Sequence, residues 1–418
     1  MKHYPQSQLL LPLLTALEEA GGKASTRDLC EAAAHKLNIS ESERSERIEI
    51  AGKLHNAWDY RCRWTQQTAK NLNLMAPAGK PYWRLTGKGE KSLAEALPGI
   101  VVTIFTTESG VALWGDCLDA VAYVDDGAVN LLFTSPPYPL NKKRAYGNLT
   151  GPQYLDWLVR IIEAYLPKMA TDGSIVLDLC DVYRKGAPFL NLYQEQLLLR
   201  LQSDLGLNLC GKFPWYSPSK MPSAHWVTVE RVRVTNAVET MFWLAASEPY
   251  ADNRQVLRQY SASYAQTLAK GVTRSPKRPS GYMFKEGAHL KDNRGSIPHN
   301  VIVCPGVGAD DNGYKEACRK AGLPAHPARM PRVPIEFIIK FLTRRGQVIA
   351  DTFAGSYRIG EIAEELGRYW IGVEKIFQYV SGGAFRFHSP VFTDVRLDQT
   401  TCERLQMALF GAPQLQSE

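Results

Sequence analysis

Apolar residues in the first part of the chain recur at the spacing of helices. Leu9, Leu13, Leu14 and Leu17 fall on one helical face, and Ser25 provides an N-cap for a second helix. The apolar positions of residues 47–64 predict a third helix. Two short apolar runs between residues 72 and 86, separated by a Pro-Ala-Gly turn, predict a hairpin. The pattern therefore predicts a small α+β unit, which we assign to residues 1–97.

Beyond a linker near Pro98-Gly99, strand and helix signals alternate, which predicts an α/β sheet. We assign residues 98–388 to this main domain and residues 389–418 to a C-terminal tail. Within the domain, residues 249–298 form a polar stretch that interleaves basic and aromatic side chains, which we interpret as an insertion. A nucleic-acid surface and a solvated loop are both open interpretations of the insertion.

The most informative local pattern is an apolar strand that ends in two prolines. Residues 129–133 are followed directly by Thr134-Ser135-Pro136-Pro137-Tyr138. Because neither proline can donate to a sheet ladder, the strand ends there in a stiff segment. At the carboxyl end of a strand, such a segment can hold a planar heterocycle. Tyr138 would stack on it, while Ser135 and the Pro136 carbonyl would accept hydrogen bonds from an exocyclic amine. A turn that only caps the strand is the alternative.

A second pattern combines a strand, a small-residue turn, a helix and a strand over residues 348–374, which is typical of a nucleoside-binding unit. Its candidate binding residues are Asp351, Phe353, Ala354, Gly355, Ser356 and Glu374. Gly355 lets a ligand approach the backbone, and Glu374 can accept hydrogen bonds from both ribose hydroxyls. Tyr357 and Arg358 stand where a dinucleotide site has more glycine, which disfavours a pyrophosphate. S-adenosylmethionine fits better, since Asp351 would attract its sulfonium. A structural unit with a chance carboxylate is the alternative.

Composition and charge narrow the class of protein. With 418 residues, 45% hydrophobic and 22% charged, the chain is an ordinary globular protein long enough for two or three domains. Its net charge of +7 suits a polyanionic partner without requiring one. No apolar run reaches membrane-spanning length. The eight cysteines are scattered, with no pair at metal-ligand spacing, so we expect no metal site and a cytoplasmic protein with reduced thiols.

Taken in this order, the two patterns resemble the amino-methylating DNA methyltransferases of the circularly permuted beta class. In that class the Ser-Pro-Pro-Tyr motif precedes the target-recognition region, and the cofactor motif comes last. The resemblance extends over residues 113–374. Residues 113–118 resemble a strand and turn of that class, and residues 172–177 resemble its next strand. Residues 214–222 and 231–239 resemble the region ahead of target recognition. Residues 326–331 resemble the segment before the cofactor motif.

This resemblance implies a Rossmann-like, S-adenosylmethionine-dependent sheet with permuted motif order, and it adds residues to the site. The catalytic residues it implies are Ser135, Pro136, Pro137 and Tyr138. Asp116 would lie near the cofactor adenine. His326 and Pro327 would help to close over the methionine part, without base catalysis by His326. The chain departs from the family at Thr352, where proline is common, and at Tyr357-Arg358, which replaces a small pair.

The implied reaction is direct transfer of a methyl group to an exocyclic amine of a base that has left the duplex. No cysteine follows a proline, so methylation at cytosine C5, which needs an attacking cysteine, is set aside. The amine itself does not separate cytosine N4 from adenine N6. Serine before the prolines usually marks the cytosine-N4 enzymes, which we favour over adenine N6. The triplet Lys142-Lys143-Arg144 would hold neighbouring phosphates, or would form a solvated loop.

The expected partner is duplex DNA, with a companion restriction endonuclease as a further possibility and the bacterial nucleoid as the setting. Residues 1–97 resemble the winged helices found on some restriction-associated proteins. Their basic residues outnumber the acidic ones between residues 53 and 91, and suit phosphate contacts. Candidate DNA contacts are Arg61, Arg63 and Arg84 there, and Arg274, Lys277 and Arg278 in the insertion. A packing or dimerisation domain, an RNA methyltransferase and a non-enzymatic DNA-binding protein are the alternatives.

Overall fold

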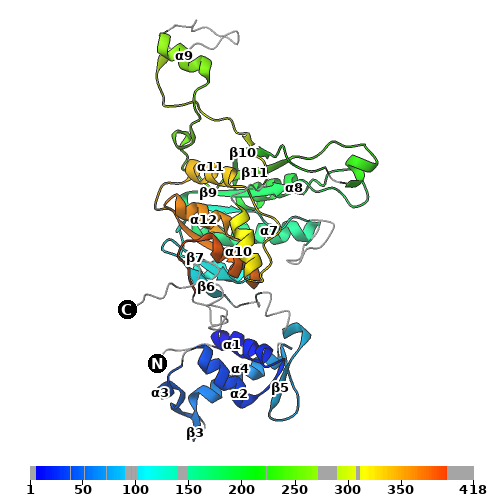
Figure 1. Ribbon diagram of the computed structural model, residues 1–418, viewed down its shortest axis with the longest axis vertical. Coiled ribbons are helices and arrows are strands. Elements are labelled where there is room, and N and C mark those ends of the chain that lie inside the picture. Colours follow the sequence, from blue (N-terminus) through cyan, green and yellow to red (C-terminus); the bar gives the residue numbers. More distant parts are fainter. Residues whose placement is uncertain are drawn as a thin grey trace.

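The computed structural model has an elongated shape with the main sheet at its centre (Figure 1). It describes residues 6–37, 39–50, 52–71, 73–89, 96, 99, 101–139, 149, 151–222, 224–271, 290–306 and 311–392. In Figure 1 the N-terminal unit lies at one end of the molecule and helix α9 at the other. No helix within the described residues is both long and apolar enough to cross a bilayer.

The N-terminal unit packs three long helices against a small antiparallel sheet of order β1-β5-β4. The leucines predicted to share a helical face are buried on α1, and Ser25 caps α2 by accepting a hydrogen bond from the Asp28 amide at 3.2 Å. The α+β prediction is therefore confirmed. The elements are α1 (Gln6–Glu19), β1 (Lys23–Ser25), α2 (Thr26–Lys36), α3 (Glu41–Arg44), β2 (Arg47–Ile50), β3 (Lys53–Asn56), α4 (Ala57–Asn71), β4 (Met75–Pro77) and β5 (Tyr82–Leu85).

The prediction of one helix over residues 47–64 is wrong in its first half. Residues 47–56 form the antiparallel hairpin of β2 and β3, in which Ile50 pairs with Lys53. Gly52 lies in the turn with a φ of 74°, a conformation that glycine adopts readily and that ends a helical run. Helix α4 begins only at Ala57. The Asn56 side chain caps its N-terminus by accepting a hydrogen bond from the Asp59 amide at 2.9 Å.

The main domain is built on a ten-stranded mixed sheet of order β12-β10-β11-β9-β8-β13-β14-β7-β6-β15. Its central strands, from β9 through β7, are parallel neighbours. The strands are β6 (Val102–Thr106), β7 (Gly110–Trp114), β8 (Val129–Thr134), β9 (Met169–Cys180), β10 (Asn208–Tyr216), β11 (Val238–Ala245), β12 (Ile302–Val303), β13 (Val348–Asp351), β14 (Tyr369–Glu374) and β15 (Val391–Phe392).

Helices cover both faces of the sheet, as the nearly continuous burial along β8 requires. Leu131 and Phe133 pack in one core cluster with α11 and α12, whereas Leu132 packs in another with α7 and α8. This arrangement confirms the predicted α/β fold. The helices of this domain are α6 (Cys117–Ala120), α7 (Pro152–Tyr165), α8 (Tyr193–Leu205), α9 (Ala262–Lys270), α10 (Asn312–Lys320), α11 (Arg332–Leu342), α12 (Arg358–Glu365) and α13 (Phe377–Gly383).

Two features of this topology matter for function. Strands β8 and β13 are far apart in the sequence but pair in parallel, with Leu132 opposite Ala350, so both carboxyl ends lie at one edge of the sheet. The polar insertion, in contrast, projects away from the sheet and carries α9, which has no buried residue (Figure 1). A cavity at the strand ends is therefore separate from the tip of the insertion.

Candidate active site

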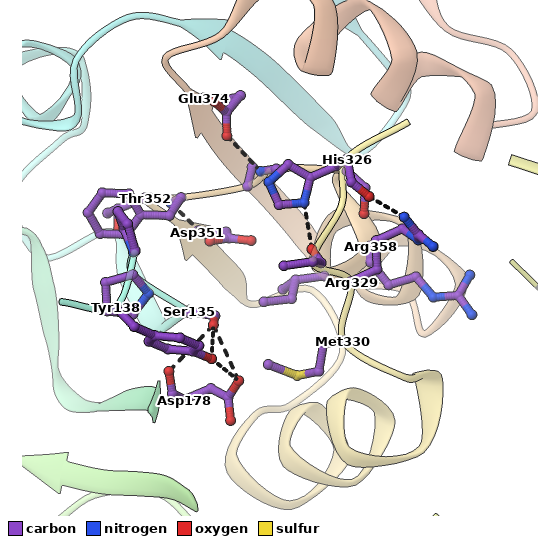
Figure 2. Close-up of a pocket in the computed structure, with 18 of the residues that line it drawn as sticks. Ser135, Tyr138, Asp178, His326, Arg329, Met330, Asp351, Thr352, Arg358 and Glu374 are labelled. Carbon is purple, nitrogen blue, oxygen red and sulfur yellow. Dashed lines mark hydrogen bonds between the residues drawn. The ribbon is translucent and has the colours of Figure 1, made fainter. Parts of the chain in front are cut away.

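The ends of three neighbouring strands meet around one cavity of about 840 Å³. The segment Ser135-Pro136-Pro137-Tyr138 follows β8, the turn of residues 351–356 follows β13, and Glu374 ends β14. All three line the cavity, and Figure 2 shows Tyr138 and Ser135 facing the same space as Asp351. The two patterns found in the sequence are thus parts of one site, and we call this space the strand-end cavity.

Ser135 lies in a polar cluster whose other members come from distant strands. Its Oγ is 3.0 Å from the Tyr138 hydroxyl and 3.3 Å from Asp178 Oδ2. The Tyr138 hydroxyl also lies 3.4 Å from Asp178 Oδ2 and donates to Glu239 Oε2 at 3.5 Å. Asp178 lies on β9 and Glu239 on β11, so the sheet itself brings these carboxylates to the serine. The hydroxyl of Ser135 is therefore held beside a buried acid.

Asp178 is poised to exchange a proton near neutral pH. Burial, followed by repulsion from Glu239, raises its pKa from 3.8 to about 7, although hydrogen bonds from Trp215, Ser135 and Tyr138 oppose the shift. The Trp215 indole donates to Asp178 Oδ1 at 3.3 Å and fixes the carboxyl group in place. A carboxyl group with this pKa can act as a base at physiological pH.

The turn of residues 351–356, which we call the acidic turn, is held by hydrogen bonds to the neighbouring strand β8. Thr134, the last residue of β8, donates from Oγ1 to Asp351 Oδ1 at 2.7 Å, and its oxygen accepts from the Phe353 amide at 3.2 Å. Burial raises the pKa of Asp351 to about 7, with the Thr134 hydrogen bond opposing it. A buried carboxylate of this kind is stabilised by a cationic ligand, because the ligand supplies the charge that desolvation removes.

Glu374 and Gly355 form the next part of the pocket wall. The two carboxylate oxygens of Glu374 accept hydrogen bonds from the Gly355 amide at 2.9 Å and the Ile376 amide at 2.8 Å. Burial raises the pKa of Glu374 to about 7. The Lys375 amide also lies in hydrogen-bonding position to this carboxylate, which has about four lone-pair directions, so the group can still accept a hydrogen bond from a ligand hydroxyl.

His326 covers Gly355 from outside the sheet. Gly355 has a φ of 51°, and a Cβ built on it would lie 3.0 Å from the His326 ring. That ring is fixed by the Ala328 carbonyl, 2.5 Å from Nδ1, and by an edge contact with Tyr379. Glycine at 355 therefore leaves room that any other residue would fill.

Pro327 and Asp116 also line the cavity, and Asp116 caps α6 by accepting a hydrogen bond from the Leu118 amide at 3.0 Å.

Tyr357 does not obstruct the cavity. Its side chain is fully buried, does not line the cavity, and lies over Gly372 and Gly383, where a Cβ would come within 2.5 Å and 2.4 Å of the ring. Its hydroxyl donates to the Leu113 carbonyl at 3.2 Å. The large residue in the turn is thus accommodated by two small ones elsewhere. Of the pair Tyr357-Arg358, Arg358 lines the cavity and Tyr357 does not.

The sequence patterns missed the acids and aromatic residues that β9, β10, β11 and α7 contribute. These are Asp178, Trp215 and Glu239, with Tyr154 and Trp157 on the aromatic wall. Asp178 directly follows an apolar strand pattern, as Ser135 and Glu374 do, and that position was a usable signal. Glu239 and Trp215 carry no such local mark.

Three of the proposed DNA contacts belong to the described residues, and none of these three lines the cavity. Arg63 on α4 and Arg84 on β5 are exposed, and Arg61 is half-buried. The other six candidates, Lys142, Lys143, Arg144, Arg274, Lys277 and Arg278, fall outside the described residues.

Comparison with known proteins identifies the family. A model of the DNA methylase family matches residues 129–384, which include every strand from β8 to β14. The chain belongs to the DNA methylase family. Residues 7–95 of this DNA methylase match a second model, the Mrr N-terminal domain. The methyltransferase class and the family resemblance inferred from the sequence are thereby confirmed.

Several relatives share most of the length of this DNA methylase. The Type II methyltransferase M.PvuII of Proteus hauseri is 36% identical over 288 residues, which are 68% of this chain and 85% of that protein. A solved structure named PvuII DNA methyltransferase (cytosine-N4-specific) aligns with a TM-score of 0.56 and 30% identity, covering 73% of this chain and 94% of that one. The DNA adenine methyltransferase YhdJ of Escherichia coli K12 is 21% identical over 297 residues, covering 69% of this chain and 86% of that protein.

Proposed function

We propose that this DNA methylase transfers a methyl group from S-adenosylmethionine to the exocyclic N4 amine of cytosine in duplex DNA. The observation that carries the proposal is the strand-end cavity, which Ser135 and Tyr138 line together with Asp351 and Glu374. The 36% identity to M.PvuII and the likeness to a cytosine-N4-specific structure support cytosine over adenine.

The residues of the cavity fit S-adenosylmethionine. Glu374 can accept hydrogen bonds from the ribose diol, and the buried carboxyl of Asp351 suits the positive sulfonium. Gly355 and the His326 ring leave a narrow space beside the turn. Asp116, paired with Lys375 at 3.7 Å, lies where the adenine would be held. When bound, the cofactor supplies an electrophilic methyl carbon.

The chain itself must turn a weak nucleophile toward that carbon. The lone pair of an exocyclic amine is delocalised into the base, so the nitrogen has to become pyramidal before it reacts. Ser135 Oγ and the Pro136 carbonyl would accept hydrogen bonds from its two N–H groups and so direct the lone pair toward the methyl carbon. Tyr138 would stack on the ring of the flipped base. The two prolines keep these acceptors rigid, so little reorganisation is needed at the moment of transfer.

The same cluster offers a route for the proton that leaves. After the nitrogen gains a fourth bond, one of its hydrogens must depart as H⁺. Ser135 Oγ, 3.3 Å from Asp178 Oδ2, can take the proton from the nitrogen while its own hydroxyl proton passes to the Asp178 carboxylate, whose raised pKa suits this transfer at neutral pH. Asp178 therefore acts through Ser135 and need not touch the base.

The test of this function is the identity of the product nucleoside. The full chain is incubated with isotopically labelled S-adenosylmethionine and duplex DNA of random sequence, and the DNA is digested and analysed by mass spectrometry. We expect labelled N4-methylcytosine within a fixed flanking sequence. Labelled N6-methyladenine would reassign the base, and label that appears only in RNA offered in parallel would reassign the substrate.

Replacing Gly355 by alanine should weaken cofactor binding. The left-handed φ costs an alanine about 1–2 kcal/mol of stability, and the new Cβ would press on the His326 ring. We expect about a tenfold loss of S-adenosylmethionine affinity by calorimetry. Gly322→Ala is the matched control, since Gly322 has a φ of 70° with open space around it. Equal affinities of the two variants would show that a Cβ at position 355 does not disturb the cofactor site.

We also propose that residues 1–97 and the insertion at 249–298 hold the duplex while the catalytic domain acts. Arg63 and Arg84 are exposed on the N-terminal unit, and half-buried Arg61 lies near Arg63 on α4. Such cations suit contacts to phosphates, which position DNA without reading its sequence. Because the M.PvuII relative is named a Type II methyltransferase, a companion endonuclease belongs to this proposal.

A further inference from the structure

Lys220, just beyond the end of β10, places a cation in the wall of the strand-end cavity. Its Nζ donates to Glu239 Oε1 at 2.7 Å, and the other oxygen of that carboxylate accepts from the Tyr138 hydroxyl at 3.5 Å. The Tyr138 hydroxyl in turn lies 3.0 Å from Ser135 Oγ. A series of polar contacts therefore leads from Ser135 to Lys220, and Glu239 both holds the ammonium group and offsets its charge.

These contacts place Lys220 on the side of the cavity where the target base would lie. Figure 2 shows Arg329, another cation of the cavity lining, across the space from Ser135 and Tyr138. Lys220 is separated from Tyr138 by the single carboxylate of Glu239, so it belongs to the Ser135 side. Its side chain is 40% exposed, so a ligand that enters the cavity can reach the ammonium group.

A cytosine that enters this side of the cavity needs hydrogen-bond donors. Its ring nitrogen N3 and carbonyl oxygen O2 are acceptors that lose their partners when the base leaves the duplex. Two donors of the cluster are already engaged, since the Trp215 indole donates to Asp178 and the Tyr138 hydroxyl lies between two carboxylates. Lys220 has three N–H groups and gives one to Glu239, its only hydrogen-bond partner among the residues that the structure describes. Two N–H groups of Lys220 therefore remain for a ligand.

We propose that Lys220 donates a hydrogen bond to O2 of the target cytosine and so distinguishes cytosine from adenine. This inference rests on the proposed function. With the amine on Ser135, a cytosine places N3 and then O2 farther along the same edge of its ring, and Lys220 lies farther from Ser135 along the series of contacts. An adenine in the same pose has its N1 in place of N3 and a C–H group in place of the carbonyl. It gives Lys220 no acceptor, so the ammonium group would lose water without gaining a partner.

The test combines a change in the protein with a change in the base. Duplexes with the flanking sequence identified by product analysis carry at the target position either cytosine or an aminopyridine C-nucleoside, which keeps the amine and the adjacent ring nitrogen but lacks O2. Single-turnover rates are measured at DNA concentrations well below KM for the full-length protein and for Lys220→Met. We expect Lys220→Met to slow transfer to cytosine about 10- to 100-fold and to leave transfer to the analogue unchanged. Lys212→Met alters an exposed lysine on β10 that does not line the cavity, and this matched control should behave as the intact protein with both targets.

Each contrary outcome points to a different conclusion. Undiminished transfer to cytosine by Lys220→Met would refute the proposal. Equal slowing with both targets would overturn a contact to O2 and assign Lys220 to the shape of the cavity wall. If Lys220→Met does not fold, Lys220→Gln removes the charge, shortens the side chain and should give the same loss confined to cytosine; equal slowing in that variant would likewise count against the contact. Methylation of adenine by the intact protein, or of neither base, would instead refute the proposed function.

Discussion

Ser135→Ala should reduce methyl transfer about 10²- to 10³-fold while leaving S-adenosylmethionine binding unchanged. The serine hydroxyl is one of two acceptors proposed for the amine hydrogens. Together with the Tyr138 hydroxyl, it links the segment Ser135-Pro136-Pro137-Tyr138 to the Asp178 carboxylate. Removing it leaves the nitrogen planar and cuts the shortest route for the departing proton. Ser135 makes no hydrogen bond to the acidic turn, so the cofactor side of the cavity should keep its shape.

Single-turnover rates with labelled cofactor measure the loss, and calorimetry measures binding. Ser381→Ala is the control for a serine-to-alanine change elsewhere, because Ser381 is buried, does not line the cavity, and its Oγ has no hydrogen-bond partner among the described residues. It should turn over like the intact protein. A Ser135→Ala protein with an undiminished single-turnover rate would remove Ser135 from the mechanism.

The parts of the site that were predictable from the sequence are those that one short segment contains. The prolines of Pro136-Pro137 stop a strand locally, and the turn after β13 follows directly from its small residues. Both therefore stand in the structure where the sequence placed them, at the ends of parallel strands. Their meeting in one cavity depended on β8 pairing with β13, which neither local pattern specifies.

The parts that were missed depend on strand order. Asp178 and Glu239 come together because β11 inserts antiparallel beside β9, with Met241 opposite Asp178, and nothing in either strand's own sequence specifies that neighbour. The error over residues 47–56 has a different cause. Apolar residues there satisfy helical spacing, but Gly52 permits a tight turn, and the resulting hairpin exposes Leu54.

Tyr357 shows why an unusual residue in a motif is difficult to judge from the motif alone. A tyrosine with a φ of 60° is disfavoured in isolation. Here its ring occupies space left by Gly372 and Gly383, one on β14 and one at the end of α13, and it packs against Phe105. Three elements, β6, β14 and α13, therefore accommodate the Tyr357 side chain. Only the folded structure shows that the acidic turn keeps its shape with a tyrosine at this position.

Asp178→Asn should reduce methyl transfer about 10²-fold and should also change how the rate depends on pH. In the intact protein only the carboxylate form can accept a proton, so the rate should fall on acidification below the pKa of about 7. The asparagine variant keeps the shape of the side chain but cannot take up the proton, so its residual rate should lack this acidic limb. Rates measured from pH 5.5 to 8.5 at saturating cofactor test the expectation.

Glu239→Gln is the informative companion, since it leaves Asp178 in place. Repulsion from Glu239 is the second cause of the raised Asp178 pKa, after burial, so its removal should move the acidic limb to lower pH. A limb that stays at the same pH in both variants would assign it to another group, such as Asp351 or Glu374, whose pKa values are also about 7.

Asp178→Asn should also change the stability of the protein. The pH dependence of this effect is opposite to that of a surface acid whose pKa is lowered by folding. Because the folded-state pKa of Asp178 is higher than that of a free carboxyl group, the native protein binds the extra proton between about pH 4 and pH 7. The free energy of unfolding of the intact protein should therefore decrease as the pH rises through this window. Asp178→Asn should be more stable than the intact protein at pH 8 by about 1–3 kcal/mol, with the difference vanishing near pH 4. Urea unfolding at the two pH values measures it, and a difference of the opposite sign at pH 8 would show that Asp178 is stabilised as the carboxylate and is not held as a weak acid.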